Sequence, residues 1–490
     1  MKFNSKITIF LLVLFCGIAL TGCHNKADNF VNNFKSFVDN VSKKYVDYTE
    51  ADWQKKEDAF AKKQEEYESL KSKLTKEQDD TIQKNIKKFN DLKAKWEKVY
   101  NIPPIFNVYI ENSGSMDGYV NGATHFETSV YNYLSDIKIS ELTDSLNLFY
   151  INSQAIPYGS DIADFIEKLE PSTFRERGGD RKTSDISNIL KTILNSHKSD
   201  KTVSILVTDG IFSPGKYKRD EKGELIKDES RKPIPIDATE YLTNQEIGIK
   251  TSFAEHLKKH KNTAVMVYQL ESKFNGKYYD KLDNPTQINE VRPFYIWIIG
   301  DMKYLKKLRE KIPDEKLQER SYKKWLNVFT IMPCNQNIEY RVSGGNSKDF
   351  KYDKNNHKVI TNLGSAGRNG MYGFNVKADF SKMLLENSYI QTPSNYENSS
   401  EFELTITPDN KSSQYTHTLT FEANNKKFKG KSINVKLKSK LPEWIEKTND
   451  NDGSQAVKHK TYGIKQQLNG VYDAFTFEGD TYTEIKIDIK

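Results

Sequence analysis

The sequence is poor in cysteine and has only a small excess of charge of one sign. Three cysteines in 490 residues exclude a disulfide-rich scaffold and a metal site built from a cysteine cluster. The balance of 74 Lys and Arg against 67 Asp and Glu gives a net charge of +7, well short of a nucleic-acid-binding signature. With 29% charged and 12% aromatic residues, the chain is too polar to span a membrane many times and too aromatic to be disordered. At about 150 residues per domain, its length suggests three domains.

The first 23 residues have the features of an export signal. Lys2 and Lys6 precede an apolar run from Ile7 to Leu20, which is shorter than the roughly 20 apolar residues of a membrane-spanning helix. The run ends in Leu20-Thr-Gly-Cys23, which resembles the lipobox of bacterial lipoproteins. The resemblance implies that residues 1–22 are a signal peptide and that Cys23 is lipidated after cleavage. An uncleaved or ordinary secretory signal with a chance cysteine is the alternative interpretation.

Lipidation of Cys23 would anchor the protein to a membrane of the bacterial cell envelope. His24 stands where an aspartate would signal retention in the inner membrane, which favours the outer membrane or the cell surface. Loss of Lys2 and Lys6 with the signal peptide lowers the net charge from +7 to +5. Cys334 is then the one cysteine without lipid, so no intrachain disulfide is expected, and we interpret Cys334 as a buried apolar residue.

Residues 23–102 are expected to form a helical stalk. Between residues 27 and 100 the sequence has neither Gly nor Pro, and aromatic and aliphatic residues recur at helical spacing. Thr75 and Gln78 are placed as a capping box, and Thr49 with Asp52 forms a weaker one. We predict two or three antiparallel helices that act as a spacer, with a partner-binding coiled coil as the alternative. Asn101-Ile-Pro-Pro104 would be the linker.

Strands alternate with helices over residues 104–312, which predicts a doubly wound α/β domain. The expected strands cover residues 105–110, 146–151, 203–207, 264–270 and 294–299, with helices over 124–137 and 304–312. Apolar residues from Ile186 to Leu194 mark a further helix that faces the core. The Lys-rich segment from Pro214 to Pro235 interrupts this alternation and is expected to be an inserted loop or hairpin.

The C-terminal part, residues 325–490, is predicted to be an antiparallel β-sandwich. Residues 402–407, 416–421 and 433–437 alternate apolar and polar side chains and are bounded by turn residues. A late helix carries Ile464, Leu468, Val471 and Phe475, and a last strand alternates Ile485, Ile487 and Ile489 with charged residues.

Oxygen-bearing side chains gather in three loops of the α/β domain. Glu111, Ser113 and Ser115 follow the first strand, Ser184 precedes the helix that faces the core, and Asp209 follows the strand over residues 203–207. Ligands of open α/β sheets lie beyond the carboxyl ends of the strands, where all three loops would open. Two carboxylates with three hydroxyls suit a hard cation such as Mg²⁺.

These loops, in this order, resemble the metal-ion-dependent adhesion site of the von Willebrand factor A domain. Ser113 and Ser115 match the two serines of the family's first loop, Ser184 matches its threonine in better register than Thr183 does, and Asp209 matches its Thr-Asp-Gly loop. Two positions depart from the family: Glu111 replaces an aspartate, and Ser184 replaces a threonine. The resemblance covers about residues 104–312.

The resemblance implies one Mg²⁺ ion, or Ca²⁺ or Mn²⁺, with the metal position open to a carboxylate of a partner protein. Glu111, Ser113, Ser115, Ser184 and Asp209 would form the site, and a fold that binds no ion is the alternative. Arg175, Arg177 and Arg181 precede Ser184 and would steer an acidic partner, or else form a basic loop without a target.

No enzymatic activity is expected. Ser113 lacks a positioned base and the nucleophile-elbow pattern, and His256 and His260 lack the zincin pattern, so we interpret them as a solvated helix face. The leading hypothesis is a lipid-anchored envelope protein that binds a protein partner through a divalent cation and has no nucleic-acid target. The alternative is a metal-independent envelope scaffold that uses its helical and β-sandwich surfaces.

Overall fold

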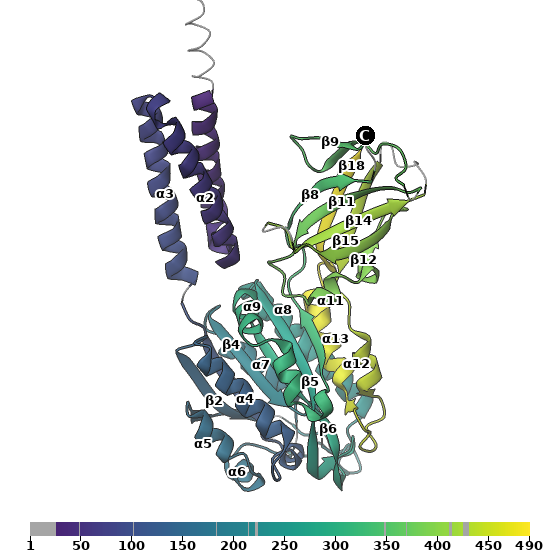
Figure 1. The fold of residues 1–490 in the computed structure, drawn as a ribbon. Helices are drawn as coiled ribbons and strands as arrows, with labels where there is room; N and C mark the ends of the chain where they lie inside the picture. Colours follow the sequence, from purple (N-terminus) through teal and green to yellow (C-terminus); the bar gives the residue numbers. More distant parts are fainter. Residues whose placement is uncertain are drawn as a thin grey trace, which may run out of the picture. The chain divides into compact units, whose positions relative to one another are not determined.

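The helical segment forms a small bundle. The computed structural model describes residues 26–490 except positions 49, 101, 183, 214, 221–223, 347–348, 369, 411–413 and 425–430. A helix over residues 26–44 is followed by α2 (Glu50–Leu70) and α3 (Lys76–Tyr100) (Figure 1). The predicted capping box is confirmed, since the Thr75 N–H donates to Gln78 Oε1 (2.8 Å) and the Gln78 N–H donates to Thr75 Oγ1 (3.3 Å). The other predicted cap, at Thr49, lies outside the described residues.

The bundle is held together by aromatic side chains on the predicted helical stripes. Phe60 and Phe89 stack with their ring centroids 3.9 Å apart, and Trp96 donates its indole N–H to the carbonyl oxygen of Tyr48 (2.8 Å). The buried aromatic residues are Phe30, Phe34, Tyr48, Trp53, Phe60, Tyr67, Phe89 and Trp96. In a Lys/Glu-rich segment these large side chains, together with a few aliphatic ones, form the buried core of the bundle. The bundle is one compact unit, and residues from 103 onward form a second one.

The second unit contains a seven-stranded sheet in the order β3-β2-β1-β4-β6-β5-β7. Its strands are β1 (Ile105–Glu111), β2 (Ser145–Ile151), β3 (Ala155–Gly159), β4 (Thr202–Thr208), β5 (Thr263–Tyr279), β6 (Pro285–Asp301) and β7 (Asn327–Ile331). Strand β1 pairs in parallel with both β2 and β4, as a doubly wound sheet requires. The sheet as a whole is mixed, because β3, β6 and β7 each pair antiparallel with their neighbours.

Helices cover both faces of this sheet. The helices are α4 (His125–Ile139), α5 (Ile162–Glu167), α6 (Pro171–Glu176), α7 (Ile186–Ser196), α8 (Ala238–Lys259), α9 (Met302–Lys311) and α10 (Asp314–Arg320). Apolar residues of α4, α5, α9 and α10 share a core with one face of the sheet, while those of α7 and α8 share a core with the other. The α/β organisation predicted from the sequence is therefore confirmed, with a mixed sheet in which the predicted strands at 264–270 and 294–299 belong to β5 and β6 and pair antiparallel.

The strands β5 and β6 form a long antiparallel hairpin rather than two separate parallel strands. All seventeen residues of each strand are paired, from Thr263 with Asp301 to Tyr279 with Pro285. Because β6 lies antiparallel between β4 and β5, strand β5 runs in the same direction as β4. Its C-terminal half therefore continues past the edge at which β1 and β4 end, and this extension forms one wall of the candidate site.

A separate β-rich part follows. One sheet has the order β12-β15-β18-β10-β9 and the other the order β13-β14-β11-β8. Their strands are β8 (Glu339–Gly345), β9 (Lys351–Tyr352), β10 (Val359–Asn362), β11 (Tyr372–Asp379), β12 (Tyr396–Asn398), β13 (Glu403–Pro408), β14 (His417–Ala423), β15 (Lys431–Lys438) and β18 (Thr481–Ile489), with the short helix α11 (Asn387–Ile390) between β11 and β12. The predicted antiparallel pairing is observed except between β10 and β18, which are parallel. Apolar side chains of both sheets pack together, as in a sandwich, and their core is continuous with that of α4, α5, α9 and α10.

Part of the segment placed in the β domain belongs to the α/β core instead. Strand β7 is an edge of the large sheet. The segment with α12 (Glu443–Thr448), β16 (Asn449–Asp450), β17 (Thr461–Tyr462) and α13 (Ile464–Phe475) also returns to it. Its apolar residues Ile445, Ile464, Leu468 and Val471 pack with those of α7 and α8. The α/β core thus includes a strand that precedes the sandwich in the sequence and a segment inserted between the sandwich strands β15 and β18.

Candidate functional site

The first loop of the site is held by an arginine. Ser113 and Ser115 follow β1 at the start of a short 3-10 helix, η3 (Gly114–Gly118), and their hydroxyl oxygens are 3.0 Å apart. Arg181 donates to the carbonyl oxygens of Asn112 (2.6 Å) and Ser113 (3.2 Å). The same guanidinium forms an ion pair with Asp117 of η3. Arg181 therefore fixes the loop that presents the two serines.

The other two loops converge on the carboxylate of Glu111. Ser184, just before α7, donates its hydroxyl to Glu111 Oε1 (2.6 Å), and Thr208 at the end of β4 donates to Oε2. Asp209 accepts the N–H of Ile211 at Oδ1 (3.0 Å), whereas its Oδ2 is buried without a hydrogen-bond partner. The structure thus brings all five residues singled out from the sequence into one cluster.

Both carboxylates of this cluster are completely buried. Burial, with a smaller contribution from the charge of Asp209, raises the pKa of Glu111 to about 7. Burial also raises the pKa of Asp209, and the N–H of Ile211, the nearby hydroxyl of Ser115 and the charge of Arg292 partly offset the rise. Two buried carboxylates lie close together, and one of their oxygens has no hydrogen-bond partner. Their negative charge is therefore unfavourable in the folded protein, and a bound cation would stabilise it.

The residues present therefore fit a hard divalent cation. Ser113, Ser115 and Ser184 supply neutral oxygens, and Glu111 and Asp209 supply negative charge, which is the donor set that Mg²⁺, Ca²⁺ and Mn²⁺ prefer. No group of three or more His, Cys, Asp or Glu side chains suited to a metal occurs among the described residues. The cluster at Glu111 has two carboxylates and draws its remaining oxygens from hydroxyls.

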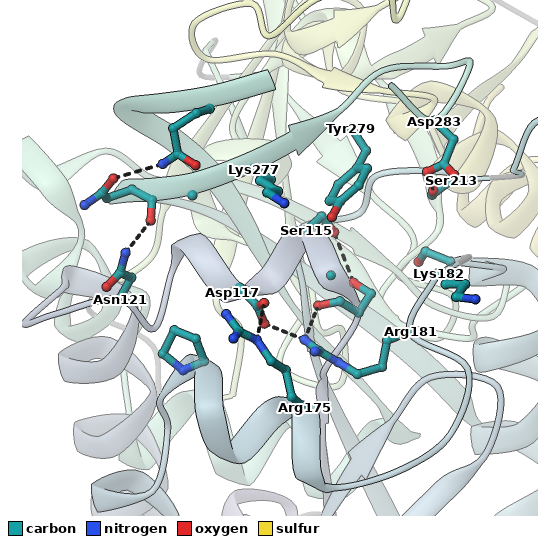
Figure 2. A pocket seen from close by; sticks show the side chains of 17 residues that line it. Ser115, Asp117, Asn121, Arg175, Arg181, Lys182, Ser213, Lys277, Tyr279 and Asp283 are labelled. Carbon is teal, nitrogen blue, oxygen red and sulfur yellow. Dashed lines mark hydrogen bonds and ion pairs between the residues drawn. The ribbon is translucent and has the colours of Figure 1, made fainter. Parts of the chain in front are cut away.

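The serines open into a cavity of about 560 Å³ (Figure 2). Its lining comes from the η3 loop, from the segment between α6 and α7, from Ser213 and from the extension of the β5–β6 hairpin. The hairpin lies directly against η3, since a Cβ atom on Gly276 would stand 2.5 Å from the Cα of Gly118. Glycine at both positions permits this close approach, which fixes the hairpin beside the loop of Ser115.

Several residues that build the site were not identified from the sequence. Thr208 donates a hydrogen bond to Glu111, and Asp117 forms an ion pair with Arg181. Lys277 and Tyr279 line the cavity from the hairpin. The third loop is also fixed from the C-terminal segment, because Gln467 of α13 donates to the carbonyl oxygen of Gly210 (2.6 Å). The Thr-Asp-Gly pattern contains Thr208, but no local pattern links a residue 257 positions away to Gly210.

The three arginines expected to steer a partner have different surroundings. Arg181 is committed to η3, and Arg177 lies over the rings of Tyr150 and Tyr158, 5.4 and 4.8 Å from their centroids. Arg175 remains mostly exposed on the cavity wall, 3.7 Å from Asp117. That Arg175 steers an acidic partner stays a prediction, whereas Arg177 packs against Tyr150 and Tyr158.

The histidine pair on α8 is not a solvated face. His256 is 6% exposed, shares a hydrogen bond with Thr263 Oγ1 (3.0 Å) and stacks on His260 with ring centroids 4.5 Å apart. The prediction was wrong for His256 because this face of α8 packs against His197 (5.1 Å) at the end of α7. Cys334 is half-buried, and burial raises the pKa of its thiol to about 11.

The predicted signal peptide and Cys23 lie outside the described residues. Among the residues that the structure does describe, none of the helices has the length and apolar character needed to cross a membrane. Comparison with protein-family models, with characterised proteins and with solved structures gives no match for this chain. The resemblance to a von Willebrand factor A domain therefore depends on the three loops and on the α/β sheet that positions them.

Proposed function

We propose that this protein is a lipid-anchored component of the bacterial cell envelope that binds a partner protein through a divalent cation. The anchor would be Cys23, and the cation would be held by Glu111, Ser113, Ser115, Ser184 and Asp209 in a domain of the von Willebrand factor A type. One observation carries the binding proposal: Glu111 and Asp209 are fully buried together beneath a cavity, and Arg292, whose charge lowers the pKa of Asp209, forms no ion pair with it in the described parts of the chain.

The residues of the cluster would divide the work of binding. When bound, the cation supplies a positive centre that can accept a carboxylate oxygen of the partner. The hydroxyls of Ser113 and Ser115 come from the loop that Arg181 fixes, so they are held in place before any ligand arrives. The charges of Glu111 and Asp209 balance that of the cation. This arrangement serves recognition rather than turnover.

The two departures from the family pattern are compatible with this proposal. Glu111 is one methylene longer than aspartate, and both of its oxygens accept hydroxyl groups, from Ser184 and Thr208. Its contribution would therefore be negative charge and the orientation of the Ser184 hydroxyl. Ser184 lacks the methyl group that restricts a threonine rotamer, and its backbone is instead held by paired hydrogen bonds with Ser213 (3.0 and 3.3 Å).

A metal titration of the chelator-treated protein tests the proposal. We expect Mg²⁺, Ca²⁺ or Mn²⁺ to raise the unfolding temperature, with about 2.7 kcal/mol of stabilisation at a hundredfold excess over Kd. Asp209→Asn and the double variant Ser113→Ala/Ser115→Ala should lose this response in calorimetric and thermal-shift titrations, because each removes charge or oxygen ligands from the cluster.

Ser129→Ala is the matched control. Ser129 is also a buried serine, but it donates to the carbonyl oxygen of Arg320, away from the cluster. This variant should be less stable than the wild type and should keep the full metal response. A wild-type protein that no divalent cation stabilises would reject the cation site and favour the metal-independent scaffold.

A further inference from the structure

Two lysines on the walls of the cavity have no ion-pair partner in the part of the chain that the structure describes. Lys182 follows Arg181 in the segment between α6 and α7, and Lys277 is on β5 in the hairpin extension. Both side chains are exposed, and Figure 2 shows them among the residues that line the cavity from different segments.

The other charges that line the cavity already have partners or hydrogen bonds. Asp117 is paired with Arg181 and lies 3.7 Å from Arg175, and Asp283 accepts a hydrogen bond from Ser213 (3.3 Å). The lining has four basic and two acidic side chains, so it is net positive. Without a cation, the negative charge of the buried Glu111 and Asp209 partly cancels this positive charge.

We propose that the partner segment presents two carboxylates, one for the cation and a second for the positive cavity walls that carry Lys182 and Lys277. This inference rests on the proposed function. With the cation in place, the negative charge of Glu111 and Asp209 is neutralised. The cavity walls that carry Lys182 and Lys277 remain positive, which is complementary to an acidic segment. A cavity of about 560 Å³ has the size of a ligand pocket and exceeds what one carboxylate needs. The partner would thus be recognised through an acidic stretch of its chain.

Blocked synthetic peptides test this inference. One series of Gly/Ser peptides carries a single Asp, and a second series carries two Asp residues separated by one to five positions. We expect one spacing to bind the Mg²⁺-saturated protein about tenfold more tightly than the single-Asp peptide in calorimetric titrations, the gain of one charge-assisted contact. The double variant Lys182→Ala/Lys277→Ala should lose this gain and keep both its Mg²⁺ affinity and its affinity for the single-Asp peptide.

Lys191→Ala, which removes an exposed lysine from α7 outside the cavity, is the control and should retain the gain. Equal binding of all peptides, or a gain that persists in the double lysine variant, would overturn the inference and leave the cation site intact. Inorganic phosphate that binds as tightly as the best peptide would also overturn it, in favour of a phosphate site. Failure of the proposed function itself appears separately, as absence of Mg²⁺ binding.

Discussion

Replacement of Glu111 by glutamine is expected to stabilise the metal-free protein by about 3 kcal/mol at pH 8. The pKa of Glu111 is raised to about 7 in the folded protein, from an ordinary value of 4.5. Between these two pH values the folded state holds a proton that the unfolded state has lost. Stability contributed by this group therefore falls as the pH rises from 4.5 to 7, and the full loss is present above pH 7. Glutamine carries no charge and avoids this loss.

The measurement is the unfolding free energy of the wild type and Glu111→Gln in chelator, at a series of pH values from 5 to 8. The difference between the two proteins should grow by about 1.4 kcal/mol per pH unit up to pH 7 and then level off. The amide can still accept a hydroxyl from Ser184 or Thr208, so the packing is retained. Glu255→Gln, on the exposed side of α8, should show no such difference. If Glu111→Gln were no more stable than the wild type at pH 8, the charge of the buried Glu111 carboxylate would be compensated within the metal-free protein.

Replacement of His197 by glutamine is expected to reduce the fall in unfolding free energy that the wild type shows below pH 6.5. Burial, followed by the charges of His256 and His260, lowers the pKa of His197 to about 3 from 6.5. Below pH 6.5 the unfolded chain binds a proton that the folded protein excludes, so stability falls as the pH decreases. The loss is about 1.4 kcal/mol per pH unit and would reach about 5 kcal/mol at pH 3.

Chemical unfolding from pH 7 to pH 5 measures this effect. The wild type should lose about 2 kcal/mol more than His197→Gln over this range. Only the difference in slope between the proteins is diagnostic, because the Glu111 effect has the opposite sign between pH 4.5 and 6.5. The glutamine amide can replace the hydrogen bond between His197 Nε2 and Ser204 Oγ (2.8 Å). Parallel slopes for the two proteins would show that the folded state admits the proton at His197.

The elements that the sequence predicts well are those with a strong local pattern. The aromatic stripes of the helical bundle, the capping box at Thr75 and the amphipathic helix α7 each depend on residues a few positions apart. The cluster at Glu111 was also predictable, because parallel strands β1 and β4 must end at the same edge of the sheet. Hydroxyl and carboxylate residues placed just after those strands therefore meet.

The parts that sequence analysis missed depend on pairing between distant segments. The outer half of the β5–β6 hairpin is polar and exposed on one side, so it lacks the apolar run of a buried strand, and its position is set by contact with η3. The α13 pattern predicts a helix, but it does not reveal that Gln467 reaches Gly210 or that the apolar face packs on α8. Lys182 and Lys277 acquire a shared role only when the fold places both on one cavity.

The central claim is that Glu111, Ser113, Ser115, Ser184 and Asp209 hold a divalent cation, and crystals of the protein soaked with Mn²⁺ test it most directly. Mn²⁺ is the probe because its anomalous scattering distinguishes it from water and from light ions. The account predicts an anomalous difference peak beside the hydroxyls of Ser113, Ser115 and Ser184 that is absent from Asp209→Asn crystals. Anomalous peaks found only elsewhere on the protein, with the Glu111–Ser184 hydrogen bond intact, would contradict it.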